Sequence, residues 1–173
     1  IVRKSLGFQF EGDADLGRTR STLIRTTELR DKINFRPPWM AWTLSQEGTG
    51  TVIAIDGNEL WLVHCALPHR AKDFSDLDLD LGIRRVLGVD PDFTYEIVHQ
   101  KDWTARRLVS NKFRKGRVFI AGDAAHVWIP AAGYGMNAGI ADVTNLTWML
   151  AGVINGWADQ SLLDAHELER HPI

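Results

Sequence analysis

The residues most able to do chemistry lie in one stretch, between Gly116 and Gly139. A short apolar run, Gly-Arg-Val-Phe-Ile-Ala-Gly, ends at Gly122 and is followed directly by Asp123. Such a run is typical of a strand buried on both faces of a parallel sheet, and ligands of open α/β sheets bind at the carboxyl ends of such strands. A carboxylate at that place can accept hydrogen bonds from two neighbouring hydroxyl groups, as acidic residues do for ribose. Asp123 is therefore the first candidate for binding a ligand.

A glycine-rich turn follows, at the predicted start of a long helix. Pro130 precedes Gly133 and Gly135 in this turn. The free N–H groups and the dipole of a helix N-terminus favour an anion or a partly negative carbonyl oxygen. A flavin ring presents such an edge and its tail carries neighbouring hydroxyls, so one flavin could occupy both places. In the alternative interpretation, Asp123 is a buried residue that caps a turn and the glycines only permit close packing. The spacing alone does not decide between the two.

The run from Gly116 to Asn145 resembles the second FAD-binding motif of the flavin-dependent aromatic hydroxylases, the p-hydroxybenzoate and phenol hydroxylase group. The residues from Gly116 to His126 fit the family pattern G-R-V-x-L-x-G-D-A-A-H, with Ile120 for the leucine. A proline, a glycine-rich turn, Asp142 and Asn-Leu then follow in the family's order. The resemblance extends along nearly the whole chain.

The resemblance implies that Asp123 binds the ribityl hydroxyls of FAD and that the turn from Pro130 to Asn137 lies beside the isoalloxazine ring. Many members have glycine where this chain has Ala132, so we expect no direct flavin contact from Ala132. Arg3 is expected to be the final arginine of the family's middle motif. The residues predicted to bind the cofactor are Arg3, Gly122, Asp123, Pro130, Gly133, Gly135, Met136 and Asn137.

The family's N-terminal Gly-x-Gly-x-x-Gly fingerprint, which binds the ADP half of FAD, does not occur in this sequence. The chain also begins with Ile1 rather than methionine, within what reads as the middle of an element. We therefore expect a C-terminal fragment of a hydroxylase, inactive on its own.

Three β-rich runs in the middle of the chain predict an antiparallel sheet: 39–44, 51–55 and 59–67. The turn Asp56-Gly57-Asn58 between the last two is a strong hairpin signal. Residues 12–20 are predicted to form a loop, and 93–98 a strand. Apolar spacing predicts helices over 76–87, 135–153 and 161–170, the last with Ser161 as N-cap.

These elements predict a mixed α+β and α/β fold of two domains. Residues 1–110 are expected to form a substrate-binding domain around the antiparallel sheet. Residues 111–173 are expected to form the last strand, the flavin loop and two helices of an incomplete FAD-binding, Rossmann-like domain.

An aromatic substrate pocket is predicted on the antiparallel sheet, with Met40, Trp42 and His64 as its binding residues. Strand alternation places Met40 and Trp42 on one face and Trp39 on the other. The alternative is that these side chains pack in the core of a half-buried sheet.

Composition argues against several other functions. The chain has 20 basic and 22 acidic residues and a formal net charge of -2, so we expect no nucleic-acid partner. The most apolar stretch, 143–154, is too short to span a membrane. The single cysteine, Cys65, excludes an intramolecular disulfide and favours a reducing compartment, so we expect a cytoplasmic protein and a buried, apolar role for Cys65. Asp123 and His126 lack a second ligand pair, so no metal site is predicted.

The resemblance implies a monooxygenase reaction for the intact protein. In the family, NAD(P)H reduces FAD, O2 adds to the reduced flavin at C4a, and the hydroperoxide transfers oxygen to a small phenolic substrate. The cofactor carries this chemistry, so no side chain is assigned a catalytic role. Epoxidation or dehydrogenation on the same fold, or a non-catalytic binding module, are the alternatives, and a homodimer stays open.

Overall fold

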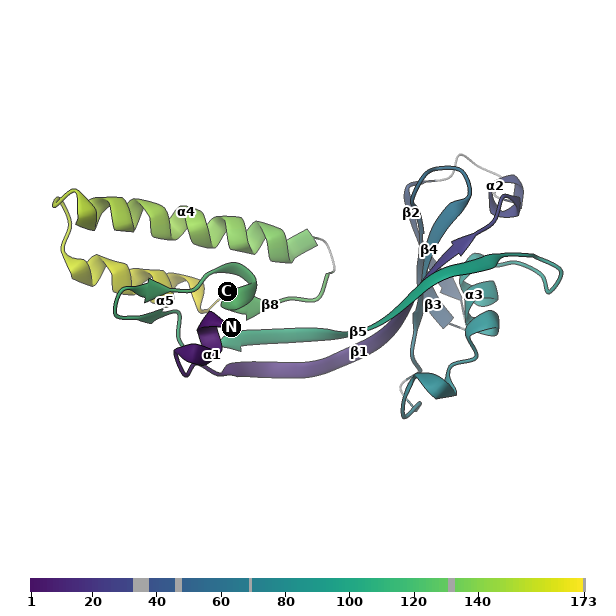
Figure 1. Cartoon of the computed structure of the whole chain (residues 1–173), viewed down its shortest axis with the longest axis horizontal. Helices are drawn as coiled ribbons and strands as arrows, with labels where there is room; N and C mark the ends of the chain where they lie inside the picture. The colour runs from purple at the N-terminus through teal and green to yellow at the C-terminus, as the bar shows by residue number, and fades with distance from the viewer. Residues whose placement is uncertain (33–37, 46–47, 69, 131–132, 173) are drawn as a thin grey trace. The chain divides into compact units, whose positions relative to one another are not determined.

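The computed structural model of the chain describes residues 1–32, 38–45, 48–68, 70–130 and 133–172. The chain divides into two compact units, and each is described here by itself. Unit 2 is Gly17–Thr104, and unit 1 combines Ile1–Leu16 with Ala105–Ile173. Among the described residues, six strands hydrogen-bond in the order β2-β3-β4-β1-β5-β8 (Figure 1). This confirms the predicted mixed class with an antiparallel sheet, whereas the roles predicted for 1–110 and 111–173 stay predictions.

The sheet of unit 2 contains β2 (Met40–Ser45), β3 (Gly48–Ala54), β4 (Leu60–Ala66) and the second half of β1 (Phe10–Arg25). Neighbours in this series pair antiparallel. The predicted hairpin between β3 and β4 is confirmed. Its turn is held by the Asp56 carboxylate, whose Oδ1 accepts the N–H groups of Asn58, Glu59 and Leu60 at 2.9, 3.1 and 3.0 Å.

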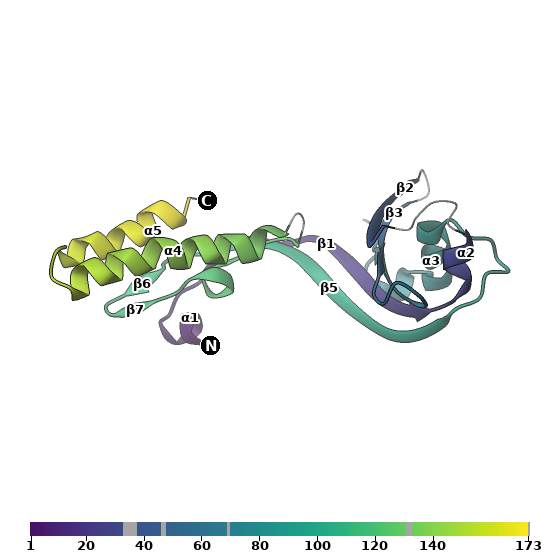
Figure 2. The same cartoon turned by 90° about the horizontal axis from the view of Figure 1, so that it is seen from above.

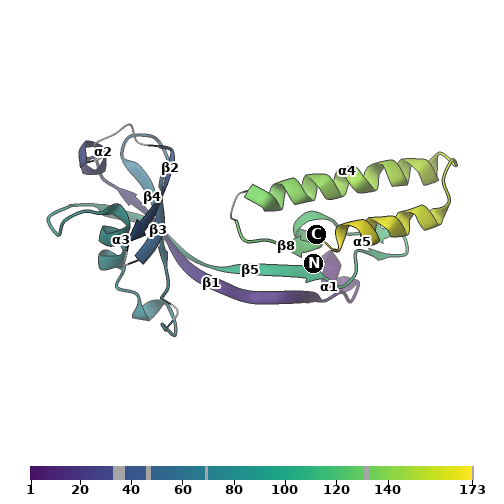
Figure 3. The ribbon, with the colours of Figure 1, turned by 180° about the vertical axis from the view of Figure 1, so that it is seen from behind.

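One face of this sheet is covered by α3 (Leu79–Leu87) (Figure 3). Asp78 caps the helix by accepting the Leu81 N–H at 3.0 Å, and Gly88 ends it in the left-handed conformation, at φ 66°. The sheet and α3 share one buried apolar core, which consists of Ile24, Leu29, Trp61, Val63, Cys65, Ile83, Val86 and Phe93. The predicted buried role of Cys65 is thereby confirmed. Unit 2 also contains two short elements, α2 (Glu28–Lys32) and η1 (Phe74–Asp76), and β5 (Glu96–Ser110) as far as Thr104.

The predicted loop over residues 12–20 is wrong, because this segment lies within β1. Glycines normally weaken a strand, but here one of them permits close approach of two backbones. A Cβ built on Gly12 would lie 2.3 Å from the carbonyl oxygen of Arg107 in β5 (Glu96–Ser110). Only glycine fits at that point of the strand pair. The strand predicted over 93–98 in fact begins at Glu96 and continues to Ser110.

The prediction of a buried parallel strand over Gly116–Gly122 is also wrong. Only Val118 and Phe119 are strand residues, forming β7, which pairs antiparallel with β6 (Arg114–Lys115) in a two-stranded hairpin. Val118 is 41% exposed, whereas Ile120 is buried in a small cluster with Phe8 and Phe113. The run is apolar because its end packs in this cluster, and among the described residues it has no parallel neighbour. α1 (Val2–Ser5) and β8 (His126–Val127) also belong to unit 1.

Two consecutive helices follow in unit 1. α4 spans Tyr134–Ile154, close to the predicted 135–153, and runs alongside α5 (Ala165–Arg170) (Figure 2). The predicted helix over 161–170 is divided, because η4 (Gln160–Asp164) is a 3-10 helix that precedes α5. Its N-cap is Asp159 rather than Ser161: the Asp159 carboxylate accepts the Ser161 N–H at 2.9 Å.

Candidate functional site

Asp123 lies in η2 (Gly122–Ala124), the turn that follows the apolar run. Gly122 takes a left-handed conformation with φ 56°, which strongly favours glycine. The Asp123 side chain is exposed, and no group among the described residues donates a hydrogen bond to its carboxylate. The interpretation of Asp123 as a buried turn cap is therefore wrong, and its oxygens are free to accept hydrogen bonds from a ligand.

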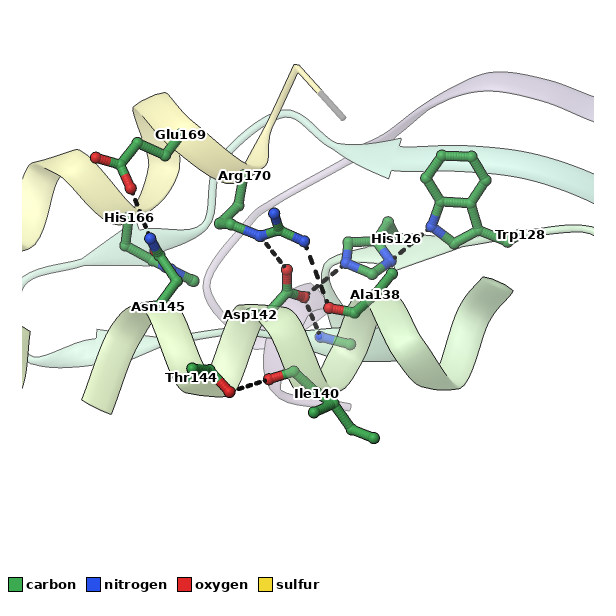
Figure 4. Close-up of polar contacts among 11 residues, drawn as sticks. His126, Trp128, Ala138, Ile140, Asp142, Thr144, Asn145, His166, Glu169 and Arg170 are labelled. Atoms are coloured by element: carbon green, nitrogen blue, oxygen red, sulfur yellow. Dashed lines mark hydrogen bonds and ion pairs between the residues drawn. The ribbon is translucent and has the colours of Figure 1, made fainter. Parts of the chain in front are cut away.

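The backbone behind Asp123 is held by a buried carboxylate, Asp142 of α4, whose side chain is fully buried. Oδ2 of Asp142 accepts the N–H of Gly122 at 2.8 Å and lies 2.6 Å from Nε2 of His126. Oδ1 accepts Nε–H of Arg170 at 2.8 Å (Figure 4). Burial alone would raise the pKa of Asp142, but the hydrogen bonds from Gly122, Arg170 and His126 outweigh it and hold that pKa below its ordinary value.

The hydrogen bonds of His126 determine its tautomer. Nε1–H of Trp128 donates to Nδ1 of His126 at 3.0 Å, so Nδ1 must carry a lone pair. The proton therefore resides on Nε2, which donates to Asp142. A neutral imidazole in this tautomer links the indole to the buried carboxylate, and both ring nitrogens are used.

The start of α4 is a glycine turn. Its N-cap residue, Gly133, is left-handed at φ 66° and, having no side chain, makes no side-chain cap hydrogen bond. The amide of Asn137 donates to the Gly133 carbonyl oxygen at 3.0 Å, which closes the turn from within. Pro130 is exposed and Met136 is 74% exposed. A Cβ added to Gly135 would meet nothing within 4 Å. Ala131 and Ala132 lie outside the described residues.

Arg3, the remaining predicted cofactor residue, lies in α1. Its guanidinium carbon is 3.2 Å from the centre of the Phe10 ring, a cation–π contact. Nε of Arg3 is buried and has no hydrogen-bond partner among the described residues. Its part in cofactor binding stays a prediction.

In unit 2, the predicted substrate residues share the sheet face opposite α3. Trp42 pairs with Thr51, and Thr51 pairs with His64, so these three side chains form one row across β2, β3 and β4. Met40 lies two residues from Trp42 on the same face. None of these residues belongs to the buried core cluster, and Trp42 is 66% exposed. Thr51 is buried and Met40 and His64 are half-buried, so only Trp42 is clearly outside the core, and the substrate-binding roles stay predictions.

His64 lies beside an indole that the sequence did not single out. The rings of His64 and Trp103 meet edge to face, with centroids 6.3 Å apart. Nε1–H of Trp103 donates to Oγ of Ser21 at 2.9 Å, and Ser21 pairs with His64 across β1 and β4. Burial lowers the pKa of His64, which favours a neutral imidazole at neutral pH. This face thus combines exposed indole surface with one neutral hydrogen-bonding group.

Asp142, Arg170 and Trp103 were not predicted as site residues. One feature of the sequence identifies Asp142: it is the single charged residue between Tyr134 and Ile154. A lone acid in an otherwise uncharged helix needs a partner if it is buried. Among the described residues, no three His, Cys, Asp or Glu side chains are placed to hold a metal ion. The described helices include none of the length and apolarity needed to cross a bilayer.

In comparison with known proteins, the family model described as FAD binding domain matches residues 1–173 of the chain. Among curated relatives, a protein of Streptomyces halstedii provisionally named polyketide hydroxylase is 37% identical over 99% of this chain and 32% of its own length. The tetracenomycin B2 monooxygenase-dioxygenase of Streptomyces olivaceus is 33% identical, with the same two coverages.

Solved structures are similar over the same extent. The substrate-free form of the rebeccamycin biosynthetic enzyme RebC matches with a TM-score of 0.78 and 32% identity, over 99% of this chain and 33% of that one. The flavin-dependent monooxygenase PieE, solved in complex with FAD and substrate, matches with a TM-score of 0.75 and 28% identity, over 99% of this chain and 30% of that one. The chain thus spans about a third of the length of each of these relatives.

Proposed function

Because the chain belongs to the FAD-binding domain family, we propose that it is part of an FAD-dependent monooxygenase that hydroxylates an aromatic, phenolic compound with NAD(P)H and O2. Unit 1 contributes part of the flavin site, and one face of the unit 2 sheet contributes to the substrate site. Relatives named as hydroxylases and monooxygenases support this reaction class.

The observation that carries the proposal is the free carboxylate of Asp123 on a turn whose backbone is fixed. Nothing among the described residues uses the Asp123 oxygens, although buried hydrogen bonds hold the preceding residue in place. Two neighbouring ribityl hydroxyls are donors of the right kind for one carboxylate. In the same unit, the N-cap residue Gly133 supplies no side-chain cap, so the first N–H groups of the helix can face the electron-rich edge of the flavin ring. The residues present therefore fit FAD.

When bound, FAD supplies the redox chemistry by which O2 is activated. The residues of the chain bind and orient: Asp123 holds the flavin tail, and the turn from Pro130 through Gly133, Gly135 and Met136 to Asn137 lies along the ring. Arg3 is proposed as a further cofactor contact. No side chain of the chain is assigned a proton transfer or a catalytic role.

The substrate is proposed to lie on the row formed by Trp42, Thr51 and His64, with Met40 at its edge. Exposed indole faces bind planar aromatic rings by stacking. The neutral imidazole of His64 can hydrogen-bond to a ring hydroxyl, and no group among the described residues competes for its nitrogens. Product analysis with a panel of phenols separates hydroxylation from epoxidation or dehydrogenation.

The decisive experiment is Asp123→Ala in the intact protein. A hydrogen bond to a charged group contributes about 1.5–3 kcal/mol, so one or two of them predict a roughly tenfold to several-hundredfold weaker Kd for FAD. Flavin fluorescence measures that Kd, and thermal unfolding of the flavin-free protein measures stability, which is expected to change little because Asp123 is exposed. An unchanged Kd together with a clear loss of apo stability would refute the assignment. The chain alone is expected to be inactive.

A further inference from the structure

The carboxylate of Asp142 is the meeting point of three segments of unit 1. Its donors come from η2, β8 and α5, through Gly122 at 2.8 Å, His126 at 2.6 Å and Arg170 at 2.8 Å (Figure 4). Both oxygens are used, and the side chain is fully buried. A buried carboxylate with this many directed donors fixes the positions of all its partners, because each displaced donor would stay unpaired.

The bond to Gly122 is the one that bears on ligand binding. Glycine has little steric preference between positive and negative φ, so its side chain does not select the left-handed conformation at φ 56°. Two contacts with α4 select it instead. The N–H of Gly122 is bonded to Asp142, and the Gly122 backbone packs on Gly139, where an added Cβ would lie 3.4 Å from Cα of Gly122. The next residue along the chain is Asp123.

The network also reaches the turn before α4. Nε1–H of Trp128 donates to His126, whose other nitrogen donates to Asp142. The Trp128 ring packs on Tyr134, the first residue of α4, with centroids 5.6 Å apart. One carboxylate thus connects the turn that carries Asp123 with the start of the helix.

We propose that Asp142 is a positioning residue for cofactor binding: it selects the backbone conformation at Gly122 that presents the Asp123 carboxylate to the flavin tail. This inference rests on the proposed function, in which Asp123 contacts FAD. The competing explanation is that Asp142 only joins α4, α5 and β8 and contributes to stability.

A double-mutant cycle on the intact protein distinguishes these explanations. The four proteins are the parent, Asp123→Ala, Asp142→Asn and the double variant. Kd for FAD is measured for each of them at a temperature well below its unfolding midpoint. The amide introduced by Asp142→Asn keeps one acceptor oxygen and presents N–H donors at the other position, so at least one of the three bonds is lost and the network that holds the Gly122 turn should loosen. Asp142→Asn is expected to weaken FAD binding about tenfold in the parent, but less than about threefold once Asp123 is alanine, because residues that act through one another are not additive.

Two outcomes of this cycle overturn the proposal. The first is the same fold loss in both backgrounds, and the second is an unchanged Kd after Asp142→Asn. Should Asp142→Asn not fold, His126→Phe enters the same cycle, since it removes the bonds to Asp142 and Trp128 while filling the space of the ring. The cycle also separates this inference from the proposed function. If Asp123→Ala alone leaves Kd unchanged, the flavin site itself is wrong, and if Asp123→Ala weakens binding but the effects add, only the positioning role is wrong.

Glu167→Gln is the matched control, because it also converts a partly buried carboxylate of unit 1 to an amide. The Glu167 carboxylate accepts from Nζ of Lys112 at 3.1 Å and from the N–H of Phe113 at 2.8 Å, and neither hydrogen bond involves η2 or Asp142. Glu167→Gln is expected to lower stability and to leave Kd for FAD within about twofold of the parent. An equal loss of affinity in Glu167→Gln and Asp142→Asn would overturn the positioning role.

Discussion

The two units are stabilised by different kinds of interaction. In the described part of Gly17–Thr104, the buried polar side chains are all threonines, and eight residues from Ile24 to Phe93 form the core. In the described part of unit 1, four buried apolar residues cluster and Ala138, Met149 and Leu163 are buried apart from them, but Asp142, His126 and His166 are buried as well. Apolar packing has no direction, whereas hydrogen bonds fix individual atoms.

This difference corresponds to the kind of surface that each unit is proposed to present. In the proposed function, unit 2 presents a broad sheet face, and α3 packed on the opposite face is sufficient for that. Unit 1 is proposed to present one carboxylate from a glycine turn, and apolar packing alone does not determine the conformation of such a turn. A buried carboxylate that bonds to the turn supplies the missing specificity, although buried ionic groups are costly to desolvate.

The largest effect is expected from Asp142→Ala. This substitution leaves the N–H of Gly122, the imidazole N–H of His126 and the guanidinium of Arg170 without their acceptor. Removing one member of a buried ionic network costs about 3–5 kcal/mol of unfolding free energy. Urea unfolding of the variant and the parent measures this loss. A loss below about 1 kcal/mol would mean that water replaces the carboxylate and that the network is not what stabilises unit 1.

A somewhat smaller and graded effect is expected in the core of unit 2. Ile83 of α3 is fully buried. Ile83→Val should lower the unfolding free energy by about 0.5–1.5 kcal/mol and Ile83→Ala by about 2–5 kcal/mol, because the loss follows the number of deleted methyl groups and the cavity they leave. Urea unfolding again gives both values, and FAD affinity should not change. Equal losses of unfolding free energy for Ile83→Val and Ile83→Ala would show that the stability of this core does not depend on the buried apolar volume at Ile83.

Acid should weaken the hydrogen-bond network around Asp142. The pKa of Asp142 is lowered in the folded chain, so the unfolded chain binds its proton more readily than the folded one. The stabilisation is therefore complete above the unfolded value of about 4 and is lost as pH falls through the folded value. Asp142→Asn should flatten the acid side of the stability profile, measured by urea unfolding between about pH 6 and pH 3. A profile as steep as that of the parent would contradict the lowered pKa.

Several features could be predicted from the sequence because they depend on local chemistry. The Asp56 hairpin and the helix over Tyr134–Ile154 follow from turn residues and apolar spacing, and both are present. The resemblance to flavin-dependent hydroxylases rested on the consecutive residues from Gly116 to His126, and membership of the FAD-binding domain family confirms it.

Other features depend on contacts that are distant in sequence. The strand at residues 12–20 was missed because Gly12 is needed against Arg107, which lies far along the chain. The Asp142 network was missed because its members are spread from Gly122 to Arg170, and neither spacing nor composition brings them together. Alternation placed Met40 and Trp42 on one face, but it could not show that His64 shares that face, because this depends on the register between strands.

The smallest and most selective test compares two glycines, one in each helix. Gly82 lies in α3, where an added Cβ would be 3.4 Å from Sγ of Cys65, and Gly139 lies in α4, where it would be 3.4 Å from Cα of Gly122. Alanine in a helix interior is favoured over glycine by about 1 kcal/mol, so both substitutions should gain the same stabilisation from helix propensity. The neighbours differ, because a thiol in an apolar core can shift slightly, whereas the Gly122 backbone is fixed by Asp142.

Gly82→Ala is therefore expected to stabilise the protein by up to about 1 kcal/mol and to leave FAD binding unchanged. Gly139→Ala should change stability by less than about 1 kcal/mol in either direction, because the helical gain is set against a new contact of the Cβ with the Gly122 backbone, which has no room to spare at 3.4 Å. It should nevertheless weaken FAD binding, since any displacement of Gly122 moves Asp123. Thermal unfolding and flavin fluorescence on both variants measure the two quantities. Gly139→Ala could leave Kd for FAD unchanged, as Gly82→Ala is expected to do. In that case the turn tolerates movement, and the hydrogen bonds that fix unit 1 are not needed for cofactor binding.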